Sequence, residues 1–144
     1  MRFILALLTV LLIGGSICAA EFDPRAAFGS VPGRDLDAAL KRAEKENKRV
    51  FLAFYDPKGD YNDQGLQIKY FTDLVETKKL LKTNFVVVLL PRGHKDLAKY
   101  TASMNTERPR FILLSPKGDF IKDDTLAQNP EWGLKIVQAL VALP

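Results

Sequence analysis

The segment 51–65, FLAFYDPKGDYNDQG, concentrates the side chains of this sequence that are best suited to chemistry. Three carboxylates, Asp56, Asp60 and Asp63, follow a run of apolar residues. Neighbouring carboxylates can serve as a general acid and a general base. In a stretch that also contains Pro and Gly, however, Asp side chains more commonly hydrogen-bond the backbone of a turn. We therefore interpret these carboxylates as turn-forming residues.

The same segment partly matches a calcium-binding EF-hand loop. Asp60, Asn62, Gln64 and Gly65 fit the first, third, fifth and sixth positions of such a loop. The twelfth position requires a bidentate Glu, and here it is Phe71. The apolar, strand-like run that precedes the segment is also the wrong context for an EF-hand. The sequence therefore predicts a solvated loop and no metal site.

Thiol chemistry is restricted by the cysteine count. The chain of 144 residues contains one Cys, Cys18, and one His, His94. Disulfide exchange needs an attacking thiolate and a second thiol, and a structural zinc site needs several Cys or His ligands. His94 could act as a general base, but no Ser or Cys partner is recognisable near it. We interpret His94 as an exposed loop residue at a helix start, and we predict no catalytic residue and no cofactor.

Residues 1–20, MRFILALLTVLLIGGSICAA, have the composition of a secretory signal. One Arg precedes the apolar run 3–13, and small residues end at Ala20. The alternatives are a retained anchor, for which the apolar run is short, and a lipid-modified Cys18, before which a bulky residue stands where a small one is usual. We expect cleavage after Ala20 and an exported protein, periplasmic or secreted, without membrane attachment and without Cys.

The rest of the chain is long enough for one domain with a single core. The formal net charge is only +4, and both signs are interspersed, as in KRAEKENKR at 41–49. Such a mixture is typical of a solvated helix face. The sequence therefore predicts a soluble surface and no binding of nucleic acid.

Four short β-rich runs predict the strands of one sheet. The first two, 49–55 and 85–90, are continuously apolar, as strands buried on both faces are. A turn over 115–118 joins a third strand at 110–114 to its hairpin partner at 119–122. The first two strands need a crossover and should be parallel, whereas the last two should be antiparallel. The pattern predicts an α/β domain with a mixed sheet and helices on both faces.

Helix signals lie before, between and after these strands. Asp35 can cap a first helix that ends near Asn47. Asp73 and Glu76 form a capping-box pattern before another helix, and Asn129–Pro130 begins the last. Two further helical segments are expected at 64–71 and 95–104. The aromatic side chains on these strands and helix faces are expected in the core rather than around a cofactor: they are Phe51, Phe54, Tyr55, Phe71, Phe85, Phe111 and Trp132.

The order of these elements and three stretches of sequence resemble the thioredoxin-like superfamily. The stretches are AALKRAEKENKRVFLAFYDPKGDY, TNFVVVLL and ERPRFILLSPKGDFI. The resemblance covers about residues 35–143, and it is greatest to exported single-domain members. It implies a thioredoxin-like fold with a mixed four-stranded sheet over 35–144, preceded by an irregular lead-in at 21–34.

Redox-active members of this superfamily carry Cys-x-x-Cys just after the first strand of this unit. The corresponding positions here are Gly59-Asp60-Tyr61-Asn62, to within about one residue. In active members, a helix N-terminus lowers the pKa of the attacking thiol. Gly59 has no side chain and Asn62 is a carboxamide, so such a helix would have no thiol to activate. The resemblance therefore implies a redox-inactive member.

Pro109 resembles the cis-proline that faces the cysteine pair in this superfamily. The residue before it is Arg108, where members usually have a smaller residue. On the resemblance we expect a cis peptide bond at Pro109; the alternative is a trans proline at the start of an edge strand. We also hypothesise that Arg108 forms an ion pair with Asp60 or Asp56 across the former active-site face.

We predict a redox-inactive module that binds another exported protein or peptide through residues 56–63 and 107–110. Exposed Tyr and Arg are favoured in protein contacts. The candidate binding residues are Asp56, Gly59, Asp60, Tyr61, Asn62, Arg108 and Pro109. The alternative is a non-redox enzyme or small-ligand binder that holds an anion, in the manner of glutathione-binding relatives, at the helix N-terminus after residue 62. A purely structural subunit is a third possibility.

Overall fold

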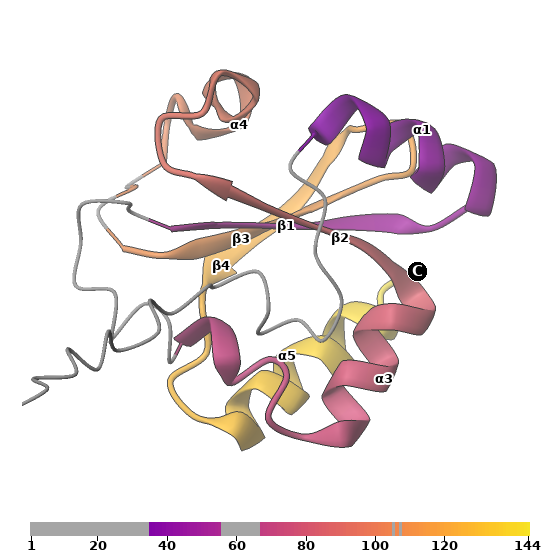
Figure 1. The fold of residues 1–144 in the computed structure, drawn as a ribbon, viewed down its shortest axis with the longest axis vertical. Coiled ribbons are helices and arrows are strands. Elements are labelled where there is room, and N and C mark those ends of the chain that lie inside the picture. The colour runs from indigo at the N-terminus through magenta and orange to yellow at the C-terminus, as the bar shows by residue number, and fades with distance from the viewer. Residues whose placement is uncertain (1–34, 56–66, 105, 107) are drawn as a thin grey trace, which may run out of the picture.

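The computed structural model describes residues 35–55, 67–104, 106 and 108–144, which form a sheet with helices on its two faces (Figure 1). The strands are β1 (Arg49–Tyr55), β2 (Phe85–Pro91), β3 (Arg110–Leu114) and β4 (Phe120–Thr125). The helices are α1 (Leu36–Glu46), α3 (Val75–Asn84), the 3₁₀ helix η2 (Lys95–Leu97), α4 (Ala98–Thr101) and α5 (Pro130–Val141). A short helical turn also covers residues 67–69. In these described ranges, no helix combines the length and the apolar character needed to cross a bilayer.

The four strands are arranged in the order β2-β1-β3-β4. β1 pairs with β2 in parallel and with β3 antiparallel, and β3 pairs with β4 antiparallel. The predicted mixed sheet, the parallel pair and the antiparallel hairpin are therefore confirmed. β1 lies inside the sheet, and its residues from Val50 to Phe54 are buried on both faces, as its continuous apolar run predicts.

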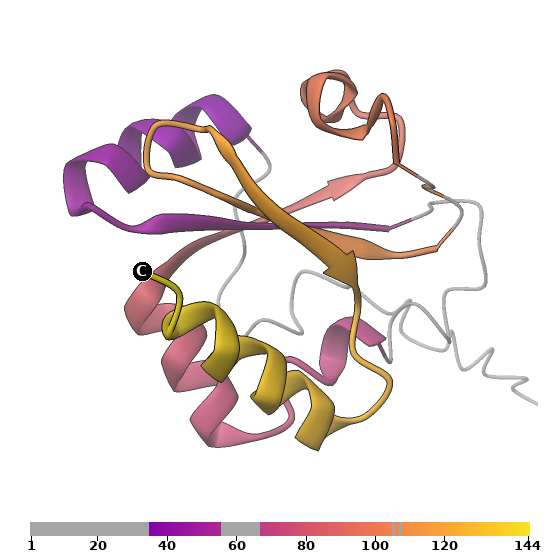
Figure 2. The same ribbon diagram turned by 180° about the vertical axis from the view of Figure 1, so that it is seen from behind.

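Two layers of helices cover the sheet (Figure 2). α1 and α4 lie over one face, and α3 and α5 lie over the other. Because successive side chains of a strand point to opposite faces, β1 contributes to two clusters. Phe51 and Ala53 pack on the side of α3 and α5, while Leu52 and Phe54 pack on the side of α1.

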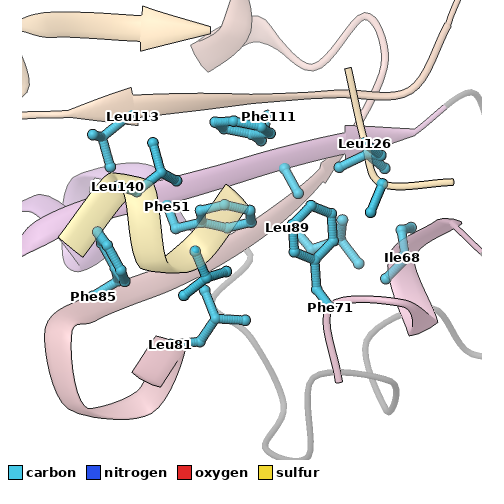
Figure 3. Packing of buried hydrophobic residues seen from close by; sticks show 13 residues of the cluster. Phe51, Ile68, Phe71, Leu81, Phe85, Leu89, Phe111, Leu113, Leu126 and Leu140 are labelled. Carbon is cyan, nitrogen blue, oxygen red and sulfur yellow. The ribbon is translucent and has the colours of Figure 1, made fainter. Parts of the chain in front are cut away.

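The core under α3 and α5 is built around phenylalanine rings (Figure 3). The Phe51 ring stacks on Phe111 with 5.1 Å between centroids, and it meets Phe71 edge-on at 5.4 Å. Phe85 also contacts Phe51 edge-on, at 6.3 Å. Phe71, which occupied the twelfth position of the rejected EF-hand match, is fully buried. The expectation that these aromatics form a core is confirmed.

Trp132 is the exception, because 55% of it is exposed. The prediction that it belongs to the core is wrong. α5 buries Gly133, Val137 and Leu140, which recur at helical spacing and mark the side that faces the sheet. Trp132 is one residue away from Gly133 and therefore about 100° around the helix, on the outer flank of α5.

The ends of α1 and α5 have the caps that the sequence predicts. The Asp35 Oδ1 atom accepts a hydrogen bond from Ala38 N–H at 3.1 Å, and Asn47 adopts the left-handed conformation at the other end of α1. The Asn129 Oδ1 atom accepts from Trp132 N–H at 2.7 Å at the start of α5. A side-chain oxygen at the N-cap satisfies a backbone donor that the helix leaves unpaired.

The capping box expected at Asp73 and Glu76 is wrong. α3 begins at Val75, and its N-cap, Leu74, makes no side-chain cap. Asp73 instead closes the preceding turn, since its N–H donates to Lys69 C=O at 2.9 Å and its carboxylate lies 3.8 Å from Lys69 Nζ. Asp73, which the local pattern assigned to the start of α3, therefore belongs to the turn that follows residues 67–69.

The predicted helix over 95–104 is shorter and begins as a 3₁₀ helix, η2, before α4. β4, by contrast, is longer than the predicted 119–122. β4 is an outer strand with no buried residue, and it carries Lys122, Asp123 and Asp124 in succession. Its pairing with β3 shifts register between Leu113 and Leu114.

One side chain of β1 ties the sheet to the end of α5. The Arg49 guanidinium donates to the carbonyls of Leu140 at 2.8 Å, Leu143 at 2.7 Å and Pro144 at 3.0 Å. The last carbonyls of a helix lack intrahelical partners and carry the negative end of its dipole. A cation at this position therefore satisfies them and stabilises the packing of α5 on the sheet.

Candidate functional site

The structure describes only some of the residues that the sequence predicts for the site. Arg108 and Pro109 are described. The other candidates lie outside the described residues: they are Asp56, Gly59, Asp60, Tyr61 and Asn62. The proposed ion pair of Arg108 with Asp60 or Asp56 therefore stays a prediction.

The strand directions bring three chain segments together at one end of the sheet. β1 and β2 are parallel and finish side by side, with Tyr55 opposite Pro91. β3 runs the other way and begins beside them, with Arg110 opposite Phe54. The N–H of Arg92 donates to the Tyr55 C=O at 2.6 Å and locks the two strand ends together. We call this region the loop end of the sheet, and its residues are Tyr55, Arg92, Arg108, Pro109 and Arg110.

Pro109 enters β3 through a trans peptide bond. Within the described residues, which include both Arg108 and Pro109, no peptide bond is cis. The expected cis-proline is therefore wrong, and the alternative of a trans proline at a strand start is the better description, although β3 is an inner strand. The Pro109 C=O accepts from Leu126 N–H at 3.2 Å and extends the β3–β4 ladder by one residue. Proline is tolerated at such a position because its missing N–H removes no essential ladder bond.

Arginine side chains give the loop end its electrostatic character. Arg110 is paired with Asp123 of β4 through both Nε, at 3.1 Å, and Nη2. Arg92 donates from Nη1 to the Thr106 C=O at 3.2 Å. Arg108 is exposed and makes no ion pair with any residue that the structure describes.

His94 serves a structural role next to this end of the sheet. It is half-buried rather than fully exposed, and its Nδ1 accepts from Asp96 N–H at 3.3 Å as the N-cap of η2. A ring nitrogen that accepts this bond is occupied in the neutral histidine and is poorly available as a general base. Among the described residues, no group of three or more His, Cys, Asp or Glu could hold a metal ion.

Arg92 is a part of the loop end that the predicted segments 56–63 and 107–110 do not include, whereas Arg110 lies in the second segment without having been named as a binding residue. Arg92 could have been found, because adjacent parallel strands end at the same edge of a sheet. Arg92 follows the second predicted strand within two residues, and Arg110 follows Pro109 directly. The two arginines that flank Pro109 were therefore visible in the sequence. The pairing of Arg110 with Asp123, however, depends on the register of the hairpin.

Comparison with known proteins identifies solved structures that have a similar fold. No family model matches this chain, and no curated protein matches it. Among solved structures, a thioredoxin from Thermus thermophilus is similar with a TM-score of 0.59 and 19% identity over 76% of this chain and 85% of that one. The disulphide isomerase from Xylella fastidiosa Temecula1 has a TM-score of 0.53 and 15% identity over 74% of this chain and 86% of that one. The DsbH oxidoreductase has a TM-score of 0.53 and 13% identity over 78% and 86%. The chain therefore has a thioredoxin-like fold.

Proposed function

We propose that this thioredoxin-like chain is an exported protein that performs no disulfide exchange and instead binds another exported protein or peptide. The contact surface consists of the loop end of the sheet and segment 56–63. The observation that carries the proposal is that Cys18, which lies ahead of the folded domain in a signal-like segment, is the only Cys in the chain.

Disulfide exchange requires sulfur atoms that the corresponding positions of this chain do not have. Exchange proceeds by attack of a thiolate on a disulfide sulfur, and a second thiol then resolves the mixed disulfide. The positions that correspond to the active cysteines are Gly59 and Asn62, and neither side chain contains sulfur. The solved structures that share this fold include proteins named as a thioredoxin and as a disulphide isomerase. This chain keeps the scaffold of such proteins without the atoms that transfer electrons.

The loop end of the sheet offers side chains that suit a protein contact. Arg108 is exposed two residues before the start of β3, and Arg is among the side chains that contribute most to protein interfaces. The Pro109 carbonyl is already used by Leu126 N–H. We therefore expect recognition through side chains rather than through backbone pairing at Pro109, and we expect the partner to offer a carboxylate to Arg108.

The alternative, an anion- or glutathione-type site at a helix N-terminus after residue 62, is not favoured by any described residue. In the described part of that region, only residues 67–69 are helical, and a turn follows them. Calorimetric titration with reduced glutathione is expected to show no binding at about 1 mM, and a saturable isotherm would support the alternative instead.

The redox claim is tested by the dithiothreitol-dependent reduction of insulin. The wild-type protein and Cys18→Ser are both expected to leave the rate at that of dithiothreitol alone. The double variant Gly59→Cys/Asn62→Cys restores two thiols at the corresponding positions and serves as the positive control. If the wild type accelerates the reaction and Cys18→Ser loses that acceleration, the chain performs thiol chemistry and the proposal of redox inactivity is wrong. Acceleration that Cys18→Ser keeps would come from a contaminating reductase, because that variant has no thiol.

The binding claim is tested by capture of partners from the exported fraction. The amount of partner that the wild type retains should fall at least about tenfold with Arg108→Glu, since the reversed charge repels the carboxylate that we expect. Lys117→Glu is the matched control, because Lys117 is exposed in the hairpin turn at the other end of β3. Equal retention by Arg108→Glu and the wild type would contradict a role for the loop end.

A further inference from the structure

An apolar hollow lies between the outer flank of α5 and the outer half of the sheet. Its volume is about 230 Å³. Its apolar lining includes Phe111 of β3 and both Trp132 and Ile136 of α5. β4 and α5 both contribute to its lining, and α5 lies on the side of the sheet opposite α1 (Figures 1 and 2). We call this hollow the α5 groove.

The groove exists because α5 is apolar on more than its inward side. Gly133, Val137 and Leu140 face the sheet, and Trp132 and Ile136, which are four residues apart, form a neighbouring stripe. Since β4 is the last strand of the described sheet, the described elements include none beyond it that covers this stripe. Trp132 consequently remains 55% exposed. An exposed Trp beside a hollow is a feature of binding sites rather than of a plain surface.

Three charged side chains line the groove, and their charges do not balance. Lys122 of β4 and Lys135 of α5 contribute two cations, and Asp124 of β4 contributes one anion. Asp124 lies opposite Phe111 and Lys122 lies opposite Leu113, so both side chains share the α5 side of the sheet. Neither Lys122 nor Lys135 forms an ion pair with a described residue. Asp124 accepts one hydrogen bond, from Thr125 N–H at 2.8 Å, through Oδ1.

We propose that the α5 groove binds the carboxyl terminus of a peptide whose last residue has a large apolar side chain. The side chain would lie against Trp132 and Ile136, the terminal carboxylate would lie near Lys122 and Lys135, and a backbone N–H would donate to Asp124. The volume is below the 300–1,000 Å³ or so of a site for a drug-sized ligand, and it suits one large side chain. Charge complementarity requires an anionic group, which an internal peptide segment of apolar residues lacks.

The acceptor at Asp124 distinguishes a peptide end from a simple fatty acid. A carboxylate can accept several hydrogen bonds, so Asp124 retains acceptor capacity toward the groove. A fatty acid anion offers no N–H donor. Its carboxylate would therefore lie near the Asp124 carboxylate without a hydrogen bond to offset the repulsion. The α5 groove is separate from the candidate residues of the loop end, so this proposal does not depend on the function proposed above.

Trp132 makes the proposal directly measurable, because it is the only Trp in the chain. The purified protein is titrated with acetyl-Gly-Ser-Gly-Leu as the free acid, and the emission of Trp132 is followed. We expect a saturable change in emission with half-saturation below about 1 mM. The same peptide with a carboxamide end should bind at least about tenfold more weakly, because it lacks the anion.

Two variants connect the signal to the groove. Lys122→Gln/Lys135→Gln should weaken binding of the free acid by at least about tenfold and abolish the preference over the carboxamide. Ala139→Leu, at an exposed position that lines the groove, should block binding while leaving both lysines in place. Lys117→Gln removes a distant exposed cation and should bind like the wild type. Circular dichroism establishes that each variant is folded.

Several results would overturn the proposal. Absence of a saturable change at about 1 mM peptide would show that the groove does not take a peptide end with useful affinity. Equal affinity for the free acid and the carboxamide would remove the role of the lysines. Tighter binding of octanoate than of the free-acid peptide would assign the groove to a fatty acid, and unchanged binding by Ala139→Leu would place the ligand elsewhere.

Discussion

Gly133 of α5 approaches the backbone of the turn after residues 67–69 more closely than a side chain permits. A Cβ atom at this position would lie 2.5 Å from the Tyr70 carbonyl oxygen and 3.1 Å from its carbonyl carbon. Carbon and oxygen atoms in favourable contact are about 3.3–3.6 Å apart. Gly133→Ala must therefore move α5 or the turn by close to an ångström. The adjacent Phe71 is fully buried against Phe51 and Phe111, so the turn cannot move without disturbing the core.

Two opposing terms set the size of the effect of Gly133→Ala. Inserting a methyl group into a well-packed site costs about 1–3 kcal/mol, and a clash with backbone, which cannot rotate away, belongs at the upper end. Replacing Gly by Ala inside a helix returns about 0.8–1.0 kcal/mol through helix propensity. The expected net loss in the free energy of unfolding is about 2 kcal/mol. For a domain of this size, that loss lowers the Tm by roughly 8 °C.

Urea denaturation followed by circular dichroism and by Trp132 fluorescence measures this loss. The matched control is Ala139→Gly, which alters an exposed position of the same helix and should cost only the propensity term, about 1 kcal/mol. The two substitutions are opposite in chemistry, but both should destabilise. If Gly133→Ala stabilises the protein as propensity alone predicts, the close approach of α5 to Tyr70 is not present in solution.

Three further substitutions test other parts of the structure. Arg49→Gln should lose about 2 kcal/mol, because it removes a cation from the carbonyls at the end of α5, and unchanged amide exchange in that last turn would contradict the contact. Phe111→Ala should lose about 3–5 kcal/mol in thermal unfolding, since its ring is fully buried; a loss below about 1 kcal/mol would argue against the packing shown in Figure 3. The side-chain hydrogen bond from Arg42, and then that from Lys48, lower the pKa of Glu46. The folded pKa therefore lies below the unfolded one, so the stabilisation is present above the unfolded pKa and is lost as the pH falls through the folded pKa. Arg42→Gln should move the NMR titration midpoint of Glu46 upward, and an unmoved midpoint would rule out this cause.

The elements that could be predicted from the sequence are those whose signals lie within a few neighbouring residues. Asp35 and Asn129 each precede a helix and bond its first turn, so the capping pattern located α1 and α5 correctly. The apolar runs at 49–55 and 85–90 needed only their composition to be recognised as buried strands. These features depend on the side chains of neighbouring residues, and the tertiary contacts of the folded chain favour the same elements.

The errors concern features that depend on distant parts of the chain. Asp73 fits a capping box by spacing, but its N–H donates to the Lys69 carbonyl and so belongs to the turn that precedes α3. The burial of Trp132 depends on whether anything covers the outer flank of α5, which the periodicity of one helix does not determine. The isomer of Pro109 was expected from resemblance, whereas the β3–β4 ladder, through Leu126, accommodates a trans proline.

The candidate site was predictable in part. Arg108 and Pro109 were identified from the resemblance, because Pro109 stands where the superfamily has its cis-proline and Arg108 precedes it. Arg92 follows from the rule that parallel strands end together, but the pairing of Arg110 with Asp123 requires the register of a hairpin that contains an irregularity. The α5 groove was beyond sequence reasoning, since it needs the rotation of α5 about its axis and its distance from β4.

The three consecutive charges of β4 bear on how the protein behaves when it is crowded. An unpaired outer strand is a template on which a second copy can add its own strand and start a fibre. Here such growth would stack Lys122 and Asp124 against identical residues of the neighbour or strip them of water, and the register shift at Leu113/Leu114 interrupts the regular ladder on which stacking depends. Replacing Lys122, Asp123 and Asp124 by Thr is accordingly expected to make light scattering rise with protein concentration, while the parent solution stays clear.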